Sequence, residues 1–226
     1  KLPRLEALEL ARECCEIAKS EWDLRETSWD FRRSPLISDY GVEPDRSEID
    51  EILTDIAYPS AFRKVRSLSF AFKSFVSHWT AQFKKLHKLQ EKNNRIFIDL
   101  FHLQDELLPE ERYDKVAILQ AELDDSALES GVIEFKRHEV IRQFISYGVG
   151  CIFGRYSLDK DGLILANAGD DLDAYLSQIP EPTLLPDESG ILPITYDNDF
   201  ADDLPSQWRA FLRAAFGDEH YEENLR

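Results

Sequence analysis

The sequence predicts a mainly helical protein: a helical spacer with one long (about 45-residue) arm helix packed against shorter helices, and few short strands. Two observations lead to this expectation. Residues 59–108 keep a heptad repeat of apolar side chains and contain no glycine and no proline after Pro59. Elsewhere most apolar residues recur at the three- to four-residue spacing of an amphipathic helix, and strand-like runs are short.

The arm helix should be one continuous element from about Ser60 to about Gln104. Pro59 and Ser60 suit a helix start, and the next proline is Pro109. Phenylalanines also lie off the heptad seams, so we expect the helix to pack against other helices of the chain. The seams are Val65, Phe72, Trp79, Leu86, Asn93 and Leu100, and Leu68, Phe75, Gln82, Leu89, Ile96 and Leu103.

A second helix is expected over residues 2–25, with an apolar face of Leu5, Leu8, Cys15, Ala18 and Trp22. Residues 36–58 form an acidic connector. Three cysteines are too few and too badly spaced for a disulfide framework or a zinc knuckle, so we interpret the adjacent pair at 14 and 15 as small buried hydrophobic residues. A reducing cytoplasm fits this usage, and no apolar run is long enough for a membrane span.

The second half of the chain mixes short helices and loops. Helices are expected over residues 115–128, 138–153 and 203–216, the last ending before Gly217, and a further amphipathic pattern opens at Asp218. Short strands are expected at residues 163–166 and 191–196. The proline-containing segment between them should be an ordered loop.

No arrangement of residues in this chain predicts a reaction. The glycines at 148, 150 and 154 match neither dinucleotide nor phosphate-loop patterns, and their apolar neighbours favour close helix packing. The pair His138-Glu139 lacks the second histidine of a zinc-protease helix. The acidic clusters at residues 170–173 and 197–199 lack the glycine and closing glutamate of a calcium loop, so turns and helix caps explain them.

The net charge of −17 argues against a nucleic-acid partner, because phosphate binding needs lysine and arginine. The distribution of charge changes this interpretation. Residues 59–100 carry 9 basic and 2 acidic side chains, a charge of +7, whereas residues 1–58 carry −7 and residues 101–226 carry −17. One segment is therefore strongly basic inside an acidic chain.

Three stretches of the sequence resemble one family. They are SEWDLRETSWDF (20–31), EKNNRIFIDLFHLQDELLPE (91–110), and FISYGVGCIFGRYSLDKDGLILAN (144–167) followed by WRAFLRAAFGDEHYEENLR (208–226). The chain resembles adenine-specific DNA methyltransferases of BREX phage-defence systems, the PglX family. The chain begins at Lys1, contains no methionine and stops inside an amphipathic pattern, so we expect an internal part of such an enzyme.

This resemblance implies a parent enzyme that methylates adenine N6 in double-stranded DNA at a specific site, with S-adenosylmethionine as cofactor. The family's Asn-Pro-Pro-Tyr motif and its glycine-rich cofactor motif do not occur here. No catalytic, cofactor-binding or metal residue can therefore be assigned in this chain. Its expected partners are DNA through the parent enzyme, other domains of the same polypeptide and other proteins of the defence system, with no membrane.

The resemblance also implies a division of the chain. Residues 1–35 would hold the helix that follows the catalytic domain, 36–58 the acidic connector, 59–108 the long basic arm helix, and 109–226 a mainly helical region leading to the target-recognition part. The expected function is a non-catalytic helical connector that spaces the two functional domains around DNA. The alternative is a protein–protein adaptor that uses a helical arm and has no nucleic-acid role.

The basic side chains of the arm helix are the candidate contacts to the DNA backbone. They would touch phosphates without reading bases. The alternative is a solvated helix face paired with acidic neighbours elsewhere in the fold. The candidates are Arg63, Lys64, Arg66, Lys73, Lys84, Lys85, Lys88, Lys92 and Arg95.

Overall fold

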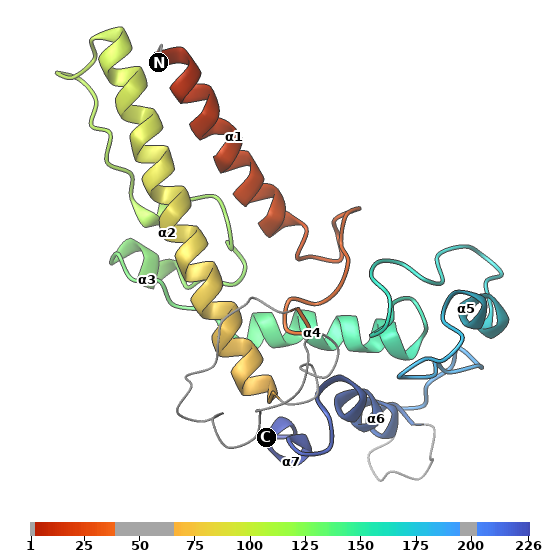
Figure 1. Ribbon diagram of the computed structural model, residues 1–226. Coiled ribbons are helices and arrows are strands. Elements are labelled where there is room, and N and C mark those ends of the chain that lie inside the picture. The colour runs from red at the N-terminus through yellow and green to blue at the C-terminus, as the bar shows by residue number, and fades with distance from the viewer. Residues whose placement is uncertain (1–2, 39–65, 195–202) are drawn as a thin grey trace, which may run out of the picture. The chain divides into compact units, whose positions relative to one another are not determined.

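The computed structural model describes residues 3–38, 66–194 and 203–226. Its elements are helices joined by turns (Figure 1), which confirms the mainly helical class. In chain order they are α1 (Pro3–Trp22), α2 (Leu68–Phe101), the 3-10 helix η3 (Tyr113–Lys115), α3 (Asp125–Glu129), α4 (Arg137–Ile152), α5 (Leu172–Gln178), α6 (Leu204–Phe216) and α7 (Tyr221–Asn224).

The predicted short strands are wrong wherever the structure describes them. Residues 163–166 and 191–194 are not strands, and 195–196 lie outside the described residues. The reason is visible for the first segment: the N–H groups of Ile164 and Leu165 bond to the carbonyls of Arg155 and Gly154, in the turn after α4, so no neighbouring strand pairs with them. An isolated antiparallel bridge joins Leu123 and Phe135.

The chain divides into two compact units. Unit 1 comprises Lys1–Trp29 and Val76–Ile141, and unit 2 comprises Asp30–Phe75 and Arg142–Arg226. The residues of α2 up to Phe75 therefore belong to unit 2 and those from Val76 onward to unit 1.

The long helix α2 is unbroken through residues 76–90, as expected, but it has 34 residues rather than about 45. It begins at Leu68, because the Ser67 hydroxyl accepts a hydrogen bond from the Phe70 N–H (3.2 Å) and the Asn224 side chain accepts one from the Leu68 N–H (2.7 Å). Partners for these first N–H groups favour a helix start at this point. Residues 60–65, also expected to be helical, lie outside the described residues.

The C-terminal end of α2 comes three residues before the expected one. His102 adopts a positive φ of 56°, and the Leu103 N–H bonds back to the Ile98 carbonyl at 2.9 Å. This left-handed residue followed by a six-to-one hydrogen bond is a Schellman ending, usually formed by glycine. A histidine in that role could not be read from the sequence pattern.

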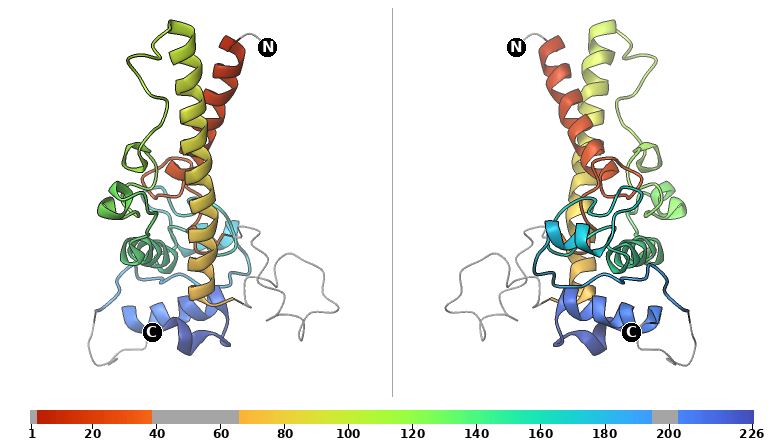
Figure 2. Two further views of the ribbon diagram at one scale, coloured as in Figure 1. Left: turned by 90° about the vertical axis from the view of Figure 1, so that its left-hand side faces the viewer. Right: turned by 90° about the vertical axis from the view of Figure 1, so that its right-hand side faces the viewer.

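In unit 1, α1 runs antiparallel to the C-terminal part of α2 (Figures 1 and 2). The helix was expected, but its buried face was predicted wrongly: Ala7, Leu10 and Ile17 are buried, whereas Leu5, Leu8, Cys15, Ala18 and Trp22 are exposed. Both sets follow helical spacing, so periodicity alone could not choose between them. The expected burial of the adjacent cysteines is wrong for the same reason, with Cys14 only partly buried.

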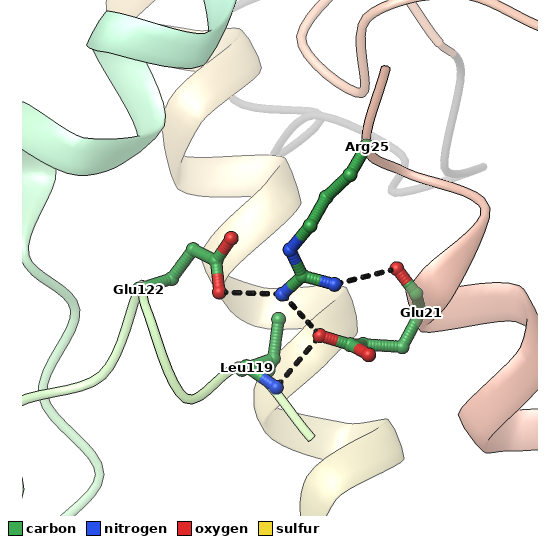
Figure 3. A network of polar contacts seen from close by, with 4 residues as sticks. All are labelled: Glu21, Arg25, Leu119 and Glu122. Atoms are coloured by element: carbon green, nitrogen blue, oxygen red, sulfur yellow. Dashed lines mark hydrogen bonds and ion pairs between the residues drawn. The ribbon is translucent and has the colours of Figure 1, made fainter. Parts of the chain in front are cut away.

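A buried polar network ties the end of α1 to the segment before α3, also within unit 1 (Figure 3). Arg25 donates hydrogen bonds to the carboxylates of Glu21 and of Glu122, the latter at 2.8 Å. The Glu21 carboxylate also accepts from the Leu119 N–H at 2.7 Å. Burial alone would lower the pKa of Arg25, but its bonds and ion pairs with the two glutamates raise that pKa above its ordinary value.

This network explains why the helix predicted over residues 115–128 is wrong. The structure has only η3 at its start and α3 at its end. Between them the chain passes through the core: Val116, Ile118 and Leu123 are buried, and Leu119, also buried, has a positive φ of 57°. The Leu119 N–H bonds to Glu21 instead of to a preceding helical turn, so tertiary contacts override the helical pattern.

In unit 2, the C-terminal part of α4 packs against α6 through aromatic side chains. The helix predicted at 138–153 is confirmed as α4, and the role of its glycines in close packing is confirmed too. A Cβ on Gly148 would lie 2.3 Å from the Trp208 ring and 2.7 Å from the Phe211 ring, and one on Gly150 would lie 2.6 Å from Tyr156. Only a residue without a side chain permits these approaches.

The predicted role of the acidic residues at 170–173 as turn and cap residues is confirmed for Asp170 and Asp171, whereas Asp173 lies in the first turn of α5. Asp171 caps α5, its carboxylate accepting from the Ala174 N–H at 3.0 Å. Asp170 accepts from the N–H groups of Asn167 and Ala166, and the Asn167 bond is the main reason that the pKa of Asp170 lies below its ordinary value. The acidic residues at 197–199 lie outside the described residues.

Helix α6 matches its prediction, with Asp203 at its N-cap and Gly217 after its last residue at a φ of 81°. Helix α5 was not expected. It is seven residues long and lies between loops, so its periodic signal is short.

Candidate nucleic-acid interface

The basic candidates occupy different surroundings on and before α2. Arg63 and Lys64 lie outside the described residues. Arg66 precedes the helix, and its guanidinium donates hydrogen bonds of 2.9 Å to the backbone carbonyls of Ile37 and Ser38, all within unit 2. Arg66 therefore has a structural partner, and fewer of its N–H groups remain for a ligand.

Two lysines of α2 form ion pairs with α1. Lys85 lies 2.6 Å from the Glu13 carboxylate and Lys92 lies 2.8 Å from the Glu6 carboxylate. Lys92 lies seven residues after Lys85 on α2, whereas its partner Glu6 lies seven residues before Glu13 on α1. The two ion pairs therefore match the antiparallel arrangement of the helices. Each pair is at least two-fifths exposed, so its contribution to stability is small, about 0–1 kcal/mol.

Arg95 is less strongly engaged. Its guanidinium is 3.9 Å from the Glu110 carboxylate, and both side chains are about two-thirds exposed. A pair at this distance and exposure is screened by solvent and salt. A polyanion could replace Glu110 as its partner at little cost.

Lys73, Lys84 and Lys88 are exposed, and they form no ion pair with any residue in the part of the chain that the structure describes. Lys84 and Lys88 are one helical turn apart. Arg95 follows Lys84 at eleven residues, which is about three turns or roughly 16 Å along one face. Lys73 lies in the part of α2 that belongs to unit 2. Lys84 and Lys88 thus share one stripe of α2 with Arg95, whose contact to Glu110 is long at 3.9 Å, and all three lie in unit 1.

The two acidic residues of the basic segment are engaged elsewhere. The Glu91 carboxylate accepts from the Glu111 N–H at 3.2 Å, and it lies 3.5 Å from His87 Nε2, which in turn contacts the Glu111 carbonyl at 2.6 Å. Asp99 accepts from the Gln104 side chain at 3.1 Å. Neither carboxylate has a short ion pair with Lys84 or Lys88, so the stripe keeps its positive charge.

This arrangement can attract a polyanion, but it offers no means of reading its sequence. Lysines act as point charges toward phosphates, whereas base reading needs side chains placed against base edges. Across the described ranges, no three His, Cys, Asp or Glu side chains form a group that could hold a metal ion. No helix within those ranges is both long and apolar enough to cross a membrane.

The sequence indicated that the nine cations could pair with acidic neighbours, but it did not show that Lys85 and Lys92 are the ones that pair with α1. One signal was available: Glu6 and Glu13 are seven residues apart on the first helix, and Lys85 and Lys92 are seven apart on the long helix. Antiparallel helices with matching heptad spacing of opposite charges favour such pairs. The structure thereby separates Lys84 and Lys88 from Lys85 and Lys92.

Comparison with known proteins gives two curated relatives. A stretch of 158 residues, 69% of this chain, is 37% identical to the adenine-specific methyltransferase PglX of Lacticaseibacillus casei (strain Zhang) and covers 12% of that protein. A stretch of 90 residues, 39% of this chain, is 43% identical to the adenine-specific methyltransferase BrxX of Escherichia coli O9:H4 (strain HS) and covers 8% of it. No protein-family model matches. The matched region thus spans only about a tenth of the length of these relatives.

Proposed function

This chain belongs to the PglX family of adenine-specific methyltransferases, and we propose that it is a non-catalytic helical connector within a longer enzyme of that family. The connector spaces the methyltransferase and target-recognition parts around double-stranded DNA. The enzyme as a whole methylates adenine with S-adenosylmethionine in phage defence. The connector itself supplies geometry and charge.

Two observations support this proposal: the length of α2, and the absence of methyltransferase motifs from the sequence. The helix is continuous over 34 residues, or about 50 Å at 1.5 Å per residue. This length exceeds one turn of B-form DNA, about 34–36 Å. The full sequence contains neither an Asn-Pro-Pro-Tyr motif nor a glycine-rich cofactor motif, although its relatives are methyltransferases.

The DNA-contacting part of the connector is the exposed stripe of α2. Lys84 and Lys88 are its centre, because both are exposed and neither forms an ion pair among the described residues. Arg95 extends it toward the C-terminal end of α2. The contacts are to phosphates, so they set position on the duplex and add affinity without sequence preference.

The connector proposal predicts that this chain alone neither binds S-adenosylmethionine nor methylates DNA, since the motifs that hold cofactor and adenine are absent. Calorimetric titration of the cofactor into residues 1–226 should give no heat of binding. The full-length enzyme, titrated in parallel as the control, should give a saturable isotherm. A saturable micromolar site in the isolated chain would contradict the connector role and would direct attention to the segment from Gly148 to Gly154.

A protein–protein adaptor without a nucleic-acid role remains the competing function. It would leave DNA affinity unchanged when the α2 stripe is neutralised, because the stripe would then never meet phosphates. The salt dependence of DNA binding by the full-length enzyme separates the two functions.

A further inference from the structure

Helix α1 is apolar on two faces. One face carries Ala7, Leu10 and Ile17, and unit 1 buries it. Five further apolar residues form a second face, which the sequence pattern had indicated as the buried one. A surface helix of a globular protein normally has one apolar stripe, whereas a helix that is apolar on most sides is normally buried.

Within unit 1, the side chains of the second face are exposed. Leu5 is 51% exposed, Leu8 48% and Trp22 55%, and Cys15 and Ala18 between them are exposed too. We call these five residues the outer face of α1. Seven residues beyond Trp22, in the turn that follows the helix, Trp29 is fully exposed.

Two exposed tryptophans near two exposed leucines are typical of a contact surface. Single exposed apolar residues are common, but a contiguous row marks a site of association. Tryptophan is also enriched among the residues that dominate binding energy at protein interfaces.

DNA is a poor occupant for this face. Helix α1 carries five glutamates, at positions 6, 9, 13, 16 and 21, against two arginines and one lysine, so its own charge is negative. Lys92 and Lys85 of α2 pair with two of these glutamates, so the case against DNA rests on the apolar side chains, which offer phosphates no partner. The chemistry of the outer face fits an apolar protein surface.

We infer that the outer face of α1 packs against an apolar surface of the same enzyme polypeptide, in a part that lies outside these 226 residues. This inference rests on the proposed function as part of a longer enzyme. The matched regions cover 12% and 8% of the two relatives, so most of a polypeptide of their length is available to cover it. Helix α1 is then an internal layer between the rest of unit 1 and that surface.

The natural thiol on the outer face provides a direct probe. In a Cys14→Ser background, maleimide labelling of Cys15 should be fast in residues 1–226, because Cys15 is exposed. In the full-length enzyme, kept monomeric, labelling should be at least about tenfold slower, since a packed site must open before it reacts. Equal rates in the two proteins would overturn the inference. Protection that appears in the isolated chain as its concentration rises would also overturn it, in favour of a second copy.

A matched pair of substitutions separates docking from folding. Leu8→Ser, on the outer face, should leave the thermal midpoint of the isolated chain unchanged and lower that of the full-length enzyme. Leu10→Ser, on the buried face, should lower both. No effect of Leu8→Ser in the full-length enzyme would refute docking. Failure of the DNA proposal would appear instead in the salt dependence of DNA binding by the lysine variants of α2. Neither leucine substitution is expected to change that salt dependence.

Discussion

Replacing Arg25 by methionine is expected to lower the free energy of unfolding of the chain by about 3 kcal/mol, the lower end of the range for breaking a buried ion pair. The substitution leaves Glu21, 5% exposed, and Glu122, 3% exposed, without the guanidinium that holds both carboxylates. Methionine keeps most of the side-chain volume, so the loss reports charge and hydrogen bonding rather than a cavity. Urea unfolding followed by circular dichroism measures it.

The matched control is Arg112→Met. Arg112 also bonds to a carboxylate, that of Asp114, but its side chain is 67% exposed, so we expect a change within about 0.5 kcal/mol. Adding Glu122→Gln to Arg25→Met should recover part of the stability, because one uncompensated charge is removed. If both single arginine variants lost the same small amount, the network would have no structural role of its own.

Gly148→Val is expected to destabilise unit 2 by about 3 kcal/mol, because its α4 segment is packed against α6 at this residue. Even a Cβ there would lie 2.3 Å from Trp208, and the Phe211 ring behind it is fully buried. The gain from replacing a helical glycine is smaller, about 0.5 kcal/mol. The cost of overpacking therefore exceeds the gain in helix propensity, and the thermal midpoint of unfolding should fall.

Ser146→Val provides the control for this experiment, since it creates the same side chain at an exposed position of α4. It should change stability by no more than about 0.5 kcal/mol. Shortening the opposing ring with Trp208→Leu should partly rescue Gly148→Val. An additive double variant would mean that the two side chains do not meet, contrary to the packing of α4 against α6.

Helices with strong local signals could be predicted from the sequence. The regular spacing of apolar residues located α1 and α4, and Asp203 with Gly217 marked both ends of α6. The long run without glycine or proline predicted an unbroken α2. Its ends could not be predicted, because one depends on a distant contact from Asn224 and the other on a left-handed histidine.

The candidate site was predictable in part. Charge counting located the basic helix, and helical spacing placed Lys84 and Lys88 on one side of it. Which cations pair with carboxylates depends on the neighbour of α2, and the sequence alone suggested the wrong face of α1 as the buried one. Apolar periodicity predicted α4 correctly but chose the exposed face of α1. The reason is that α1 has two rows of apolar residues with helical spacing, and spacing alone does not show which row is buried.

The salt dependence of DNA binding by the full-length enzyme tests the central claim most directly. Neutralising Lys84 and Lys88 together, each by glutamine, should weaken binding about equally on cognate and unrelated duplexes. The slope of log affinity against log salt concentration should fall by about 0.9 for each phosphate that no longer has a lysine partner, or about 1.8 in all. Lys85→Gln with Lys92→Gln, which removes the lysines already paired with glutamates, should change the slope much less. An unchanged slope in the first variant would contradict a connector that touches DNA.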